Sequence, residues 1–323
     1  DAPRVCNYVT VSDASRFILA FGVNDYGSTT QDPMLVRWSD QESPNVWTPA
    51  ATNQAGSYRL SHGSQIVTAV QTRQEVLVLT DAAVYSMQYL GAPYVWGFQI
   101  MGDNISIMGP NAAITVNNIT YWMGVDKFYS YSGRVETLPC TLRQYIYDDI
   151  NVQQGYQVFA GTNEGYNEIW WFYCSASATT VDKYVIYNYL ERTWYYGTMA
   201  RSSWLDSPLR EQPMATPYAD TNGQLVYHET GNDDGTVDPP LPIDAYVQSS
   251  DFDIGDGHNF GFVWRLIPDI TFDGSDVNKP QVNFTVRPRQ FPGTNYGTSD
   301  NPAVKSTQNF SGQRSYNVQQ FTE

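Results

Sequence analysis

Side chains that could bind a metal or move a proton are few and widely spaced in this sequence. The histidines are His62, His228 and His258, and no two of them have a spacing typical of a metal site. Asp148 and Asp149 are adjacent, so on a helix their carboxylates point about 100° apart and cannot flank one glycosidic bond. These patterns predict turn histidines and a solvated helix end.

An acidic segment late in the chain invites comparison with a calcium site. Asp251–Gly257 begins like an EF-hand loop, which needs acids at its first, third and fifth positions, glycine at the sixth and glutamate at the twelfth. Here Gly255 takes the fifth position, Asp256 the sixth and Phe262 the twelfth. We therefore interpret this segment as a turn between strands.

The segment Ser39–Trp47 resembles the Asp-box turn of sialidase propellers, in which serine, aspartate, glycine and tryptophan stabilise a hairpin. The glycine is missing here, and no other part of the sequence carries a copy. The sequence also lacks a nucleophile elbow, a P-loop and a dinucleotide-binding glycine motif. We therefore predict a protein that is not an enzyme, with no catalytic residue, no cofactor-binding residue and no metal ligand.

The composition favours a protein with large, permanent interfaces. Aromatic residues make up 15% of the 323 residues and charged residues only 16%, and aromatic side chains suit both pleated sheets and interfaces. The net charge of −15 argues against tight nucleic-acid binding, because neutralising phosphates needs Lys and Arg. The three cysteines form no CxxC pair, which favours folding in a reducing cytoplasm, and neither a membrane span nor a signal peptide is visible.

Short apolar runs with period-2 character, separated by Gly, Asn and Asp, predict an all-β protein. One segment breaks this pattern, because the apolar positions of 142–150 share a helical face and Pro139 precedes them. We expect a short helix there between two groups of strands. The predicted strands are 17–21, 34–38, 65–70, 76–80, 84–87, 113–116, 119–123, 128–131, 156–159, 169–173, 184–189 and 225–228.

These strands form a repeat. The segment Leu79–Ser86 returns as Gly124–Ser130, with the shared aspartates Asp81 and Asp126 offset by 45 residues. Central strands near positions 19, 78, 121, 171 and 226 are separated by 59, 43, 50 and 55 residues. Periods of about 40 to 50 residues with four strands each indicate the blades of a β-propeller. A β-sandwich remains an alternative, because only one pair of repeats aligns clearly.

Residues 231–235 and 239–242 are rich in Gly, Asn, Asp and Pro, which are typical of loops. They predict a domain boundary there. We expect a β-propeller-like domain over 1–235 and a β-rich C-terminal element over 236–323, with strands at 262–267 and 282–287. This element is either a separate domain or the last blades. Because the chain opens on Asp1 and stops in mid-pattern, we expect natural segments to be missing at both ends.

Several short sequence segments resemble the tail hub or nozzle proteins of short-tailed bacteriophages. That group includes packaged-DNA stabilisation and tail tubular B proteins. The resemblance spans about 35–265, most of the chain. The segments are VRWSDQE at 36–42, WTP at 47–49, NQAG at 53–56, YRLSHGS at 58–64, YWMG at 121–124, LPC at 138–140, WFY at 171–173, YNY at 187–189 and SDFDIGDG at 250–257.

The resemblance implies a virion structural protein of the tail that is folded in the host cytoplasm. It further implies a homo-hexameric ring below the portal and adaptor, contacts with tail fibre, spike or needle proteins, and a lumen through which DNA passes without specific binding. It carries over no functional residue. The rival interpretation is a carbohydrate-binding propeller or sialidase-like glycoside hydrolase, and an unrelated scaffold or adhesin propeller is a third.

Overall fold

The protein is described by a computed structural model. It describes residues 2–218, 223–231, 233–234, 241–243, 246–249, 265–272, 280–286, 306–311 and 321–322, with the single residues 252, 255, 259 and 261. Contacts within the chain divide it into two compact units, Asp1–Asn232 and Asp233–Glu323.

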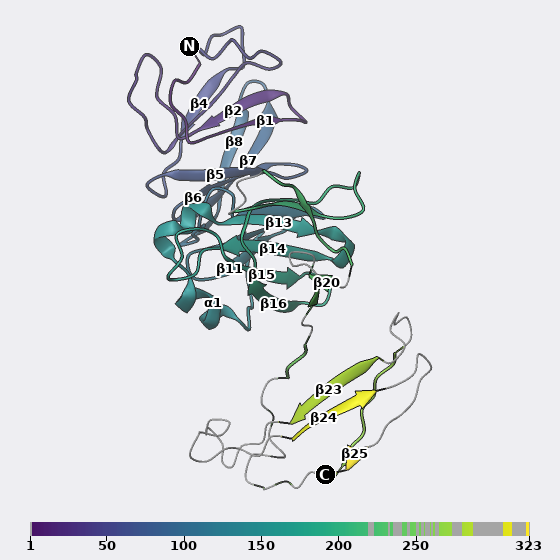
Figure 1. The fold of residues 1–323 in the computed structure, drawn as a ribbon. Helices are drawn as coiled ribbons and strands as arrows, with labels where there is room; N and C mark the ends of the chain where they lie inside the picture. Colours follow the sequence, from purple (N-terminus) through teal and green to yellow (C-terminus); the bar gives the residue numbers. More distant parts are fainter. Residues whose placement is uncertain are drawn as a thin grey trace. The chain divides into compact units, whose positions relative to one another are not determined.

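The first unit consists of antiparallel sheets that follow one another along the chain (Figure 1). In the described part of this unit there are four four-stranded sheets and one three-stranded sheet, which we number 1 to 5. Sheet 1 contains β1 (Tyr8–Ser12), β2 (Phe17–Phe21), β3 (Leu35–Trp38) and β4 (Gly56–Arg59). Sheet 2 contains β5 (Ile66–Gln71), β6 (Val76–Thr80), β7 (Ala83–Gly91) and β8 (Val95–Asp103).

The later sheets repeat this plan. Sheet 3 contains β9 (Ala113–Val116), β10 (Ile119–Met123), β11 (Phe128–Tyr131) and β12 (Val135–Leu138). Sheet 4 contains β13 (Phe159–Asn163), β14 (Glu168–Tyr173), β15 (Lys183–Asn188) and β16 (Thr193–Thr198). Sheet 5 contains β17 (Arg201–Leu205), β18 (Met214–Pro217) and β19 (Val226–Tyr227). In each sheet the strands lie in chain order, so every connection is a simple meander.

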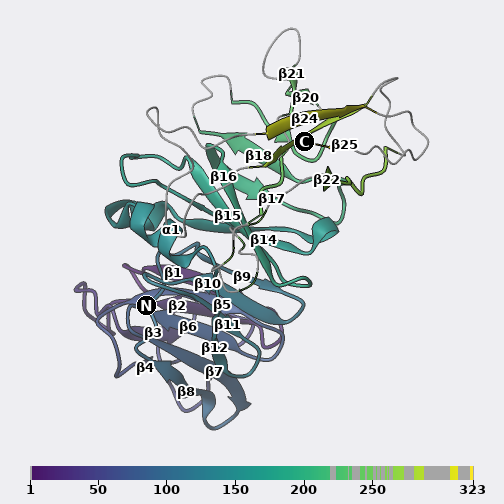
Figure 2. The ribbon, with the colours of Figure 1, turned by 90° about the horizontal axis from the view of Figure 1, so that it is seen from below.

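The sheets are arranged like propeller blades. The first strand of each sheet lies next to the first strand of the following sheet, from β1 through β5, β9 and β13 to β17. Figure 2 shows the successive sheets of this unit stacked beside one another. In the part of the chain that the structure describes, they do not close into a ring. The predicted all-β, propeller-like fold is therefore confirmed, and the alternative of a sandwich is wrong for this unit.

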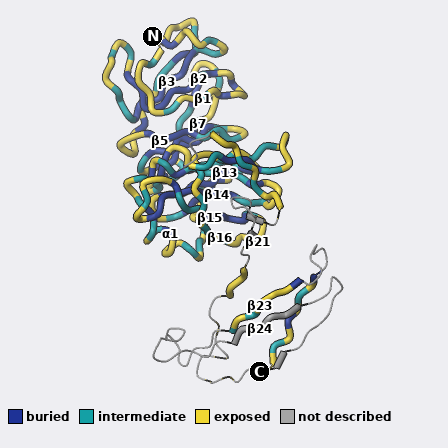
Figure 3. Tube along the Cα trace, viewed as in Figure 1, coloured by how far each residue is buried: buried dark blue, intermediate teal, exposed yellow. Residues whose placement is uncertain are grey.

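The core lies between neighbouring sheets. In sheets 1 to 4 the second and third strands carry most of the buried residues, because both of their faces pack against other sheets or loops (Figure 3). Trp122 and Trp171 are fully buried in the cluster that joins sheets 3 and 4, with Phe128 5.0 Å from the Trp171 ring. Aromatic residues at these positions therefore hold the sheets together.

The predicted repeat corresponds to real structure. Asp81 and Asp126 both lie in the turn between the second and third strands of their sheets. The predicted centres near 19, 78, 121 and 171 fall in β2, β6, β10 and β14, which are all second strands. The centre near 226 is wrong, because β19 is the third strand of sheet 5 and β18 is the second.

A helical connection joins sheets 3 and 4. The predicted helix is confirmed as α1 (Arg143–Asp149), which buries Ile146. The strand predicted at 156–159 is wrong, because a 3-10 helix, Val152–Gln157, precedes β13. The Asn151 side chain accepts a hydrogen bond from the Gln153 backbone N–H and caps this turn, which diverts the apolar run from an extended conformation.

The second unit is described as three two-stranded pairs. They are β20 (Asp233–Asp234) with β21 (Leu241–Pro242), β22 (Arg265–Leu266) with β25 (Phe321–Thr322), and β23 (Gln281–Val286) with β24 (Ser306–Ser311). The run predicted at 282–287 matches β23, and β22 covers two residues of the run at 262–267. Among the described residues, no helix combines the length and apolar character needed to cross a bilayer.

Candidate functional site

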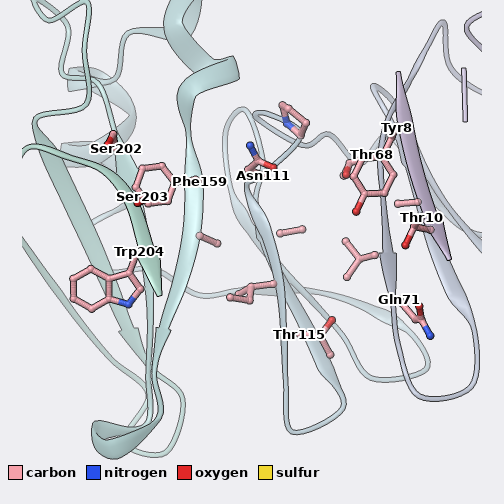
Figure 4. Close-up of a pocket in the computed structure, with 16 residues that line it drawn as sticks. Tyr8, Thr10, Thr68, Gln71, Asn111, Thr115, Phe159, Ser202, Ser203 and Trp204 are labelled. Atoms are coloured by element: carbon pink, nitrogen blue, oxygen red, sulfur yellow. The ribbon is translucent and has the colours of Figure 1, made fainter. Parts of the chain in front are cut away.

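A cavity of about 560 Å³ runs along the first strands of all five sheets, and we call it the axial pocket. Figure 4 shows its labelled side chains in chain order, from Tyr8 and Thr10 on one side to Ser202, Ser203 and Trp204 on the other. Its lining residues are Tyr8, Thr10, Thr68, Ala69, Val70, Gln71, Pro110, Asn111, Ala113, Ile114, Thr115, Phe159, Ala160, Ser202, Ser203 and Trp204.

The strand period explains how these side chains reach the pocket. Successive side chains of a strand point to opposite faces, so Tyr8 and Thr10 of β1 line the pocket while Val9 and Val11 are exposed on the other face. Sheets 3 and 4 are fixed to each other beside the pocket, where the Ala160 backbone N–H donates to the Asn111 carbonyl at 2.8 Å. The pocket therefore forms because the first strands of successive sheets lie side by side.

The pocket lining carries no ionisable group other than the Tyr8 phenol. It consists of hydroxyl, amide, aliphatic and aromatic side chains, without Asp, Glu, Lys, Arg, His or Cys. Within the described residues, the side chains of Tyr8, Thr10, Thr68 and Asn111 make no hydrogen bond to the protein. The partly exposed groups of Tyr8, Thr10 and Asn111 can therefore bind a neutral, hydrogen-bonding ligand, whereas Thr68 is buried. The lining offers no carboxylate or imidazole for proton transfer.

Other polar groups of the lining are already engaged. Ser203 Oγ lies 2.6 Å from Thr216 Oγ1 on the neighbouring strand β18. Thr115 Oγ1 is 2.8 Å from Thr120 Oγ1 on β10. These bonds lie within sheets 5 and 3, so they set the positions of side chains at one side and in the middle of the pocket.

Trp204 lines one side of the pocket and packs between sheets 4 and 5. Its ring stacks on Trp170 with centroids 4.9 Å apart, and its indole N–H donates to the Thr162 carbonyl at 2.7 Å. Phe159 stacks on Phe172 in the same way, at 4.8 Å. Both aromatic residues are therefore held in place by packing before any ligand binds.

His228 lies behind Trp204, with the two rings 4.7 Å apart. The Nε of Arg201 donates a hydrogen bond to Nε2 of His228 at 3.1 Å, so the imidazole is neutral and acts as an acceptor. Burial, together with the Arg201 charge, lowers the pKa of His228 to about 4. The histidine therefore supports the packing of sheet 5 and does not face the pocket lining.

The histidines do not converge in the described structure. His62 is exposed in a turn, where its Nδ1 lies 2.9 Å from Ser61 Oγ. His228 is packed against Trp204, and His258 lies outside the described residues. Across the described ranges, no group of three His, Cys, Asp or Glu side chains could hold a metal ion.

The acidic segments have structural roles where they are described. Asp149 Oδ2 accepts a hydrogen bond from the Lys183 ammonium at 2.7 Å, which ties α1 to β15. Asp148 is exposed. The calcium-like segment Asp251–Gly257 falls outside the described residues except for Phe252 and Gly255.

The segment Ser39–Trp47 closes a loop over sheet 1. Trp47 is buried against the outer face of this sheet, and its indole N–H donates to the Pro44 carbonyl at 2.8 Å. Asp40 Oδ1 accepts from the Gln54 backbone N–H at 2.8 Å. The serine, aspartate and tryptophan of this segment therefore stabilise a long loop instead of a tight hairpin.

Comparisons with known proteins identify no family for this chain. No family model matches the sequence, and no curated protein matches it significantly. The similar solved structures include the extracellular domain of BT4673 from B. thetaiotaomicron, which is described as a one-component system in one structure and as a hybrid two-component system in another. None of these comparisons connects the chain to tail hub proteins.

The structural likenesses are distant. The two BT4673 structures share 11% and 10% identity with this chain at TM-scores of 0.37 and 0.35. Each match covers 70% of this chain and 33% of the other, so this chain spans about a third of their length. The N-terminal domain of Nup159 shares 9% identity at a TM-score of 0.31, over 69% of this chain and 74% of that domain. Likenesses at this level carry no argument about function.

Proposed function

We propose that this protein is a structural subunit of a bacteriophage tail, at the hub or nozzle that extends the DNA exit channel below the portal and adaptor. The short sequence segments that resemble tail hub proteins supply the tail assignment. The structural observation that supports a subunit role is the set of large apolar side chains exposed on a chain with a net charge of −15. Such side chains are costly to leave in water and are buried when subunits assemble.

The proposal includes a homo-hexameric ring that supports tail fibre, spike or needle proteins and lets DNA pass through its lumen. A strongly acidic subunit suits this role, because a negative surface does not trap a polyanion. The uncharged axial pocket is consistent with a role that does not depend on acid–base chemistry.

The test is negative-stain electron microscopy, with light scattering, on the full-length natural protein alone and with the products of neighbouring genes. Six-fold rings with a central hole, or incorporation into a tail, are the expected results. A stable monomer that ignores these partners would contradict the proposal.

The axial pocket favours one second candidate, the binding of a neutral glycan. Hydroxyl and amide groups of Tyr8, Thr10 and Asn111 are available there beside fixed aromatic rings, which is the chemistry that a sugar needs. Hydrolysis by a sialidase mechanism is less well supported, because that mechanism needs three convergent arginines and the lining contains none. Glycan-array screening followed by calorimetry would test this candidate, and Asn111→Ala should weaken any binding that uses the pocket.

A further inference from the structure

Two half-exposed tyrosines from different elements are in contact beside the outermost strand of sheet 4. Tyr145 of α1 and Tyr196 of β16 have ring centroids 4.5 Å apart, with ring planes inclined at 45°. Figure 1 shows α1 beside β16. The exposed fractions of the two residues are 45% and 50%. Within the described residues neither phenol makes a hydrogen bond, so no protein group of that part holds either hydroxyl.

The fold brings these two rings together before any reaction. α1 is tied to β15 by the hydrogen bond from the Lys183 ammonium to Asp149, at 2.7 Å. β15 in turn pairs with β16, where Val185 lies opposite Tyr196. The two tyrosines therefore sit on elements that are already joined, and they need little movement to react with each other.

This pair combines ring contact with exposure, which sets it apart from the other described tyrosines. Among the residues that the structure describes, two tyrosine rings are in contact here and at Tyr121–Tyr187 only. The rings of that second pair are 6.1 Å apart in the core, and each residue is only 7% exposed. An oxidant in solution therefore meets one described pair of tyrosines that is placed to couple.

We propose that Tyr145 and Tyr196 form an oxidative cross-linking site, at which a haem peroxidase using hydrogen peroxide acts as the one-electron oxidant. Each phenol loses one electron and one proton and becomes a tyrosyl radical. A carbon–carbon bond then forms between the two ring carbons next to the oxygens, and the hydrogen on each of these carbons moves to its oxygen and restores the phenol. The two electrons and two protons released reduce one molecule of peroxide to two molecules of water.

The new bond would stabilise sheet 4. It closes the chain from residue 145 to residue 196 into a loop that contains β13, β14 and β15. Closing such a loop restricts the unfolded chain, which favours the folded state. It also fixes β16, the outermost strand, to the segment that precedes β13. The cross-link goes beyond the proposed tail function and does not depend on it, because it involves one chain only.

The first test treats the full chain, at low concentration to limit contacts between molecules, with a haem peroxidase and hydrogen peroxide. We expect dityrosine fluorescence, and tandem mass spectrometry should find Tyr145 linked to Tyr196 with the loss of two hydrogen atoms. Tyr145→Phe and Tyr196→Phe keep the packed rings but remove the phenol. Each should lower the yield at least about tenfold, because groups held in contact react far faster than groups that must meet by diffusion.

The matched controls change exposed tyrosines close to the pair. Tyr195→Phe alters the neighbour in β16, and Tyr156→Phe alters the 3-10 helix that follows α1. Both should give the wild-type yield, and circular dichroism checks that each variant is folded. Absence of dityrosine in the wild type, an unchanged yield in Tyr145→Phe or Tyr196→Phe, or cross-links only between chains would each overturn the proposal.

Urea unfolding tests the effect of the bond on the fold. We expect the cross-linked wild type to unfold at a higher urea concentration than the untreated protein, whereas Tyr196→Phe treated in the same way should show no shift. Since that variant has met the same oxidant, a shift confined to the wild type comes from the cross-link. An equal midpoint in cross-linked and untreated wild type would refute the stabilising role.

Discussion

His228 links the protonation of a single side chain to the packing of sheet 5. Its folded-state pKa is about 4, below the value of 6.5 for a free histidine, because of burial and the neighbouring Arg201. Between pH 6.5 and about 4, the unfolded chain therefore binds a proton at this position that the folded chain does not. The free energy of unfolding consequently falls as the pH is lowered through this window.

We expect the loss of unfolding free energy between pH 7.5 and pH 5 to be about 1–2 kcal/mol larger in the wild type than in His228→Gln. Glutamine keeps an acceptor for Arg201 but does not titrate. Urea unfolding at the two pH values measures the difference, and His62→Gln, at an exposed turn, should behave like the wild type. Equal pH dependence in wild type and His228→Gln would refute the assignment.

The sequence contained no histidine spacing typical of a metal site, but it could not show what His228 does. His228 was predicted to lie in a turn, and the partners that determine its chemistry, Arg201 and Trp204, come from a different strand of sheet 5. The Asp40 and Trp47 contacts were closer to the prediction, because they are made within one loop and depend on short sequence separations.

At the scale of the strand, burial decided which elements could be predicted. The confirmed strands include β2, β6, β10 and β14, whose side chains are buried almost continuously and therefore give long apolar runs. The first and last strands of the sheets were mostly missed. In β17 and β12 polar and exposed residues predominate, because one side of such a strand faces the axial pocket or solvent.

This explains why the candidate site could not be predicted. The axial pocket is lined by the first strands, and β1, β13 and β17 were absent from the predicted set or misplaced in it. Small and polar residues such as Thr10, Asn111 and Ser203 give no motif of their own. They are brought together only by the order of the sheets.

A glycine controls how closely sheets 4 and 5 approach. A Cβ added to Gly161 in β13 would overlap the Trp204 indole, which is held by its hydrogen bond to Thr162 and its stack on Trp170. We expect Gly161→Ala to lower the free energy of unfolding by about 1–3 kcal/mol, as overpacking does in other cores.

Chemical denaturation followed by tryptophan fluorescence measures this effect. Gly165→Ala is the control, because the nearest atom to its added Cβ is Asn163 Oδ1 at 3.8 Å. A Gly161→Ala protein as stable as Gly165→Ala would mean that Trp204 can move aside and that the sheets are not packed as described.

At the scale of the whole molecule, net charge gives a prediction about nucleic acid. With 18 Lys and Arg against 33 Asp and Glu, the chain cannot neutralise many phosphates at once. We expect duplex DNA to bind more weakly than the roughly 10⁻⁴ to 10⁻⁶ M of typical non-specific binding at physiological salt. Fluorescence anisotropy with labelled duplex at two salt concentrations tests this, and tight, salt-sensitive binding would exclude a channel that DNA passes freely.

The even number of strands in sheets 1 to 4 has a mechanical consequence. Because neighbouring strands are antiparallel, a four-stranded meander begins and ends at the same end of its sheet. Tension along the chain would pull the first and last strands away from that end. Their backbone hydrogen bonds would then break one after another, starting at the pulled end. Pressure across the sheets would instead compress the aromatic layers between them. We therefore expect the first unit to unfold at low force under tension along the chain and to resist compression across its sheets.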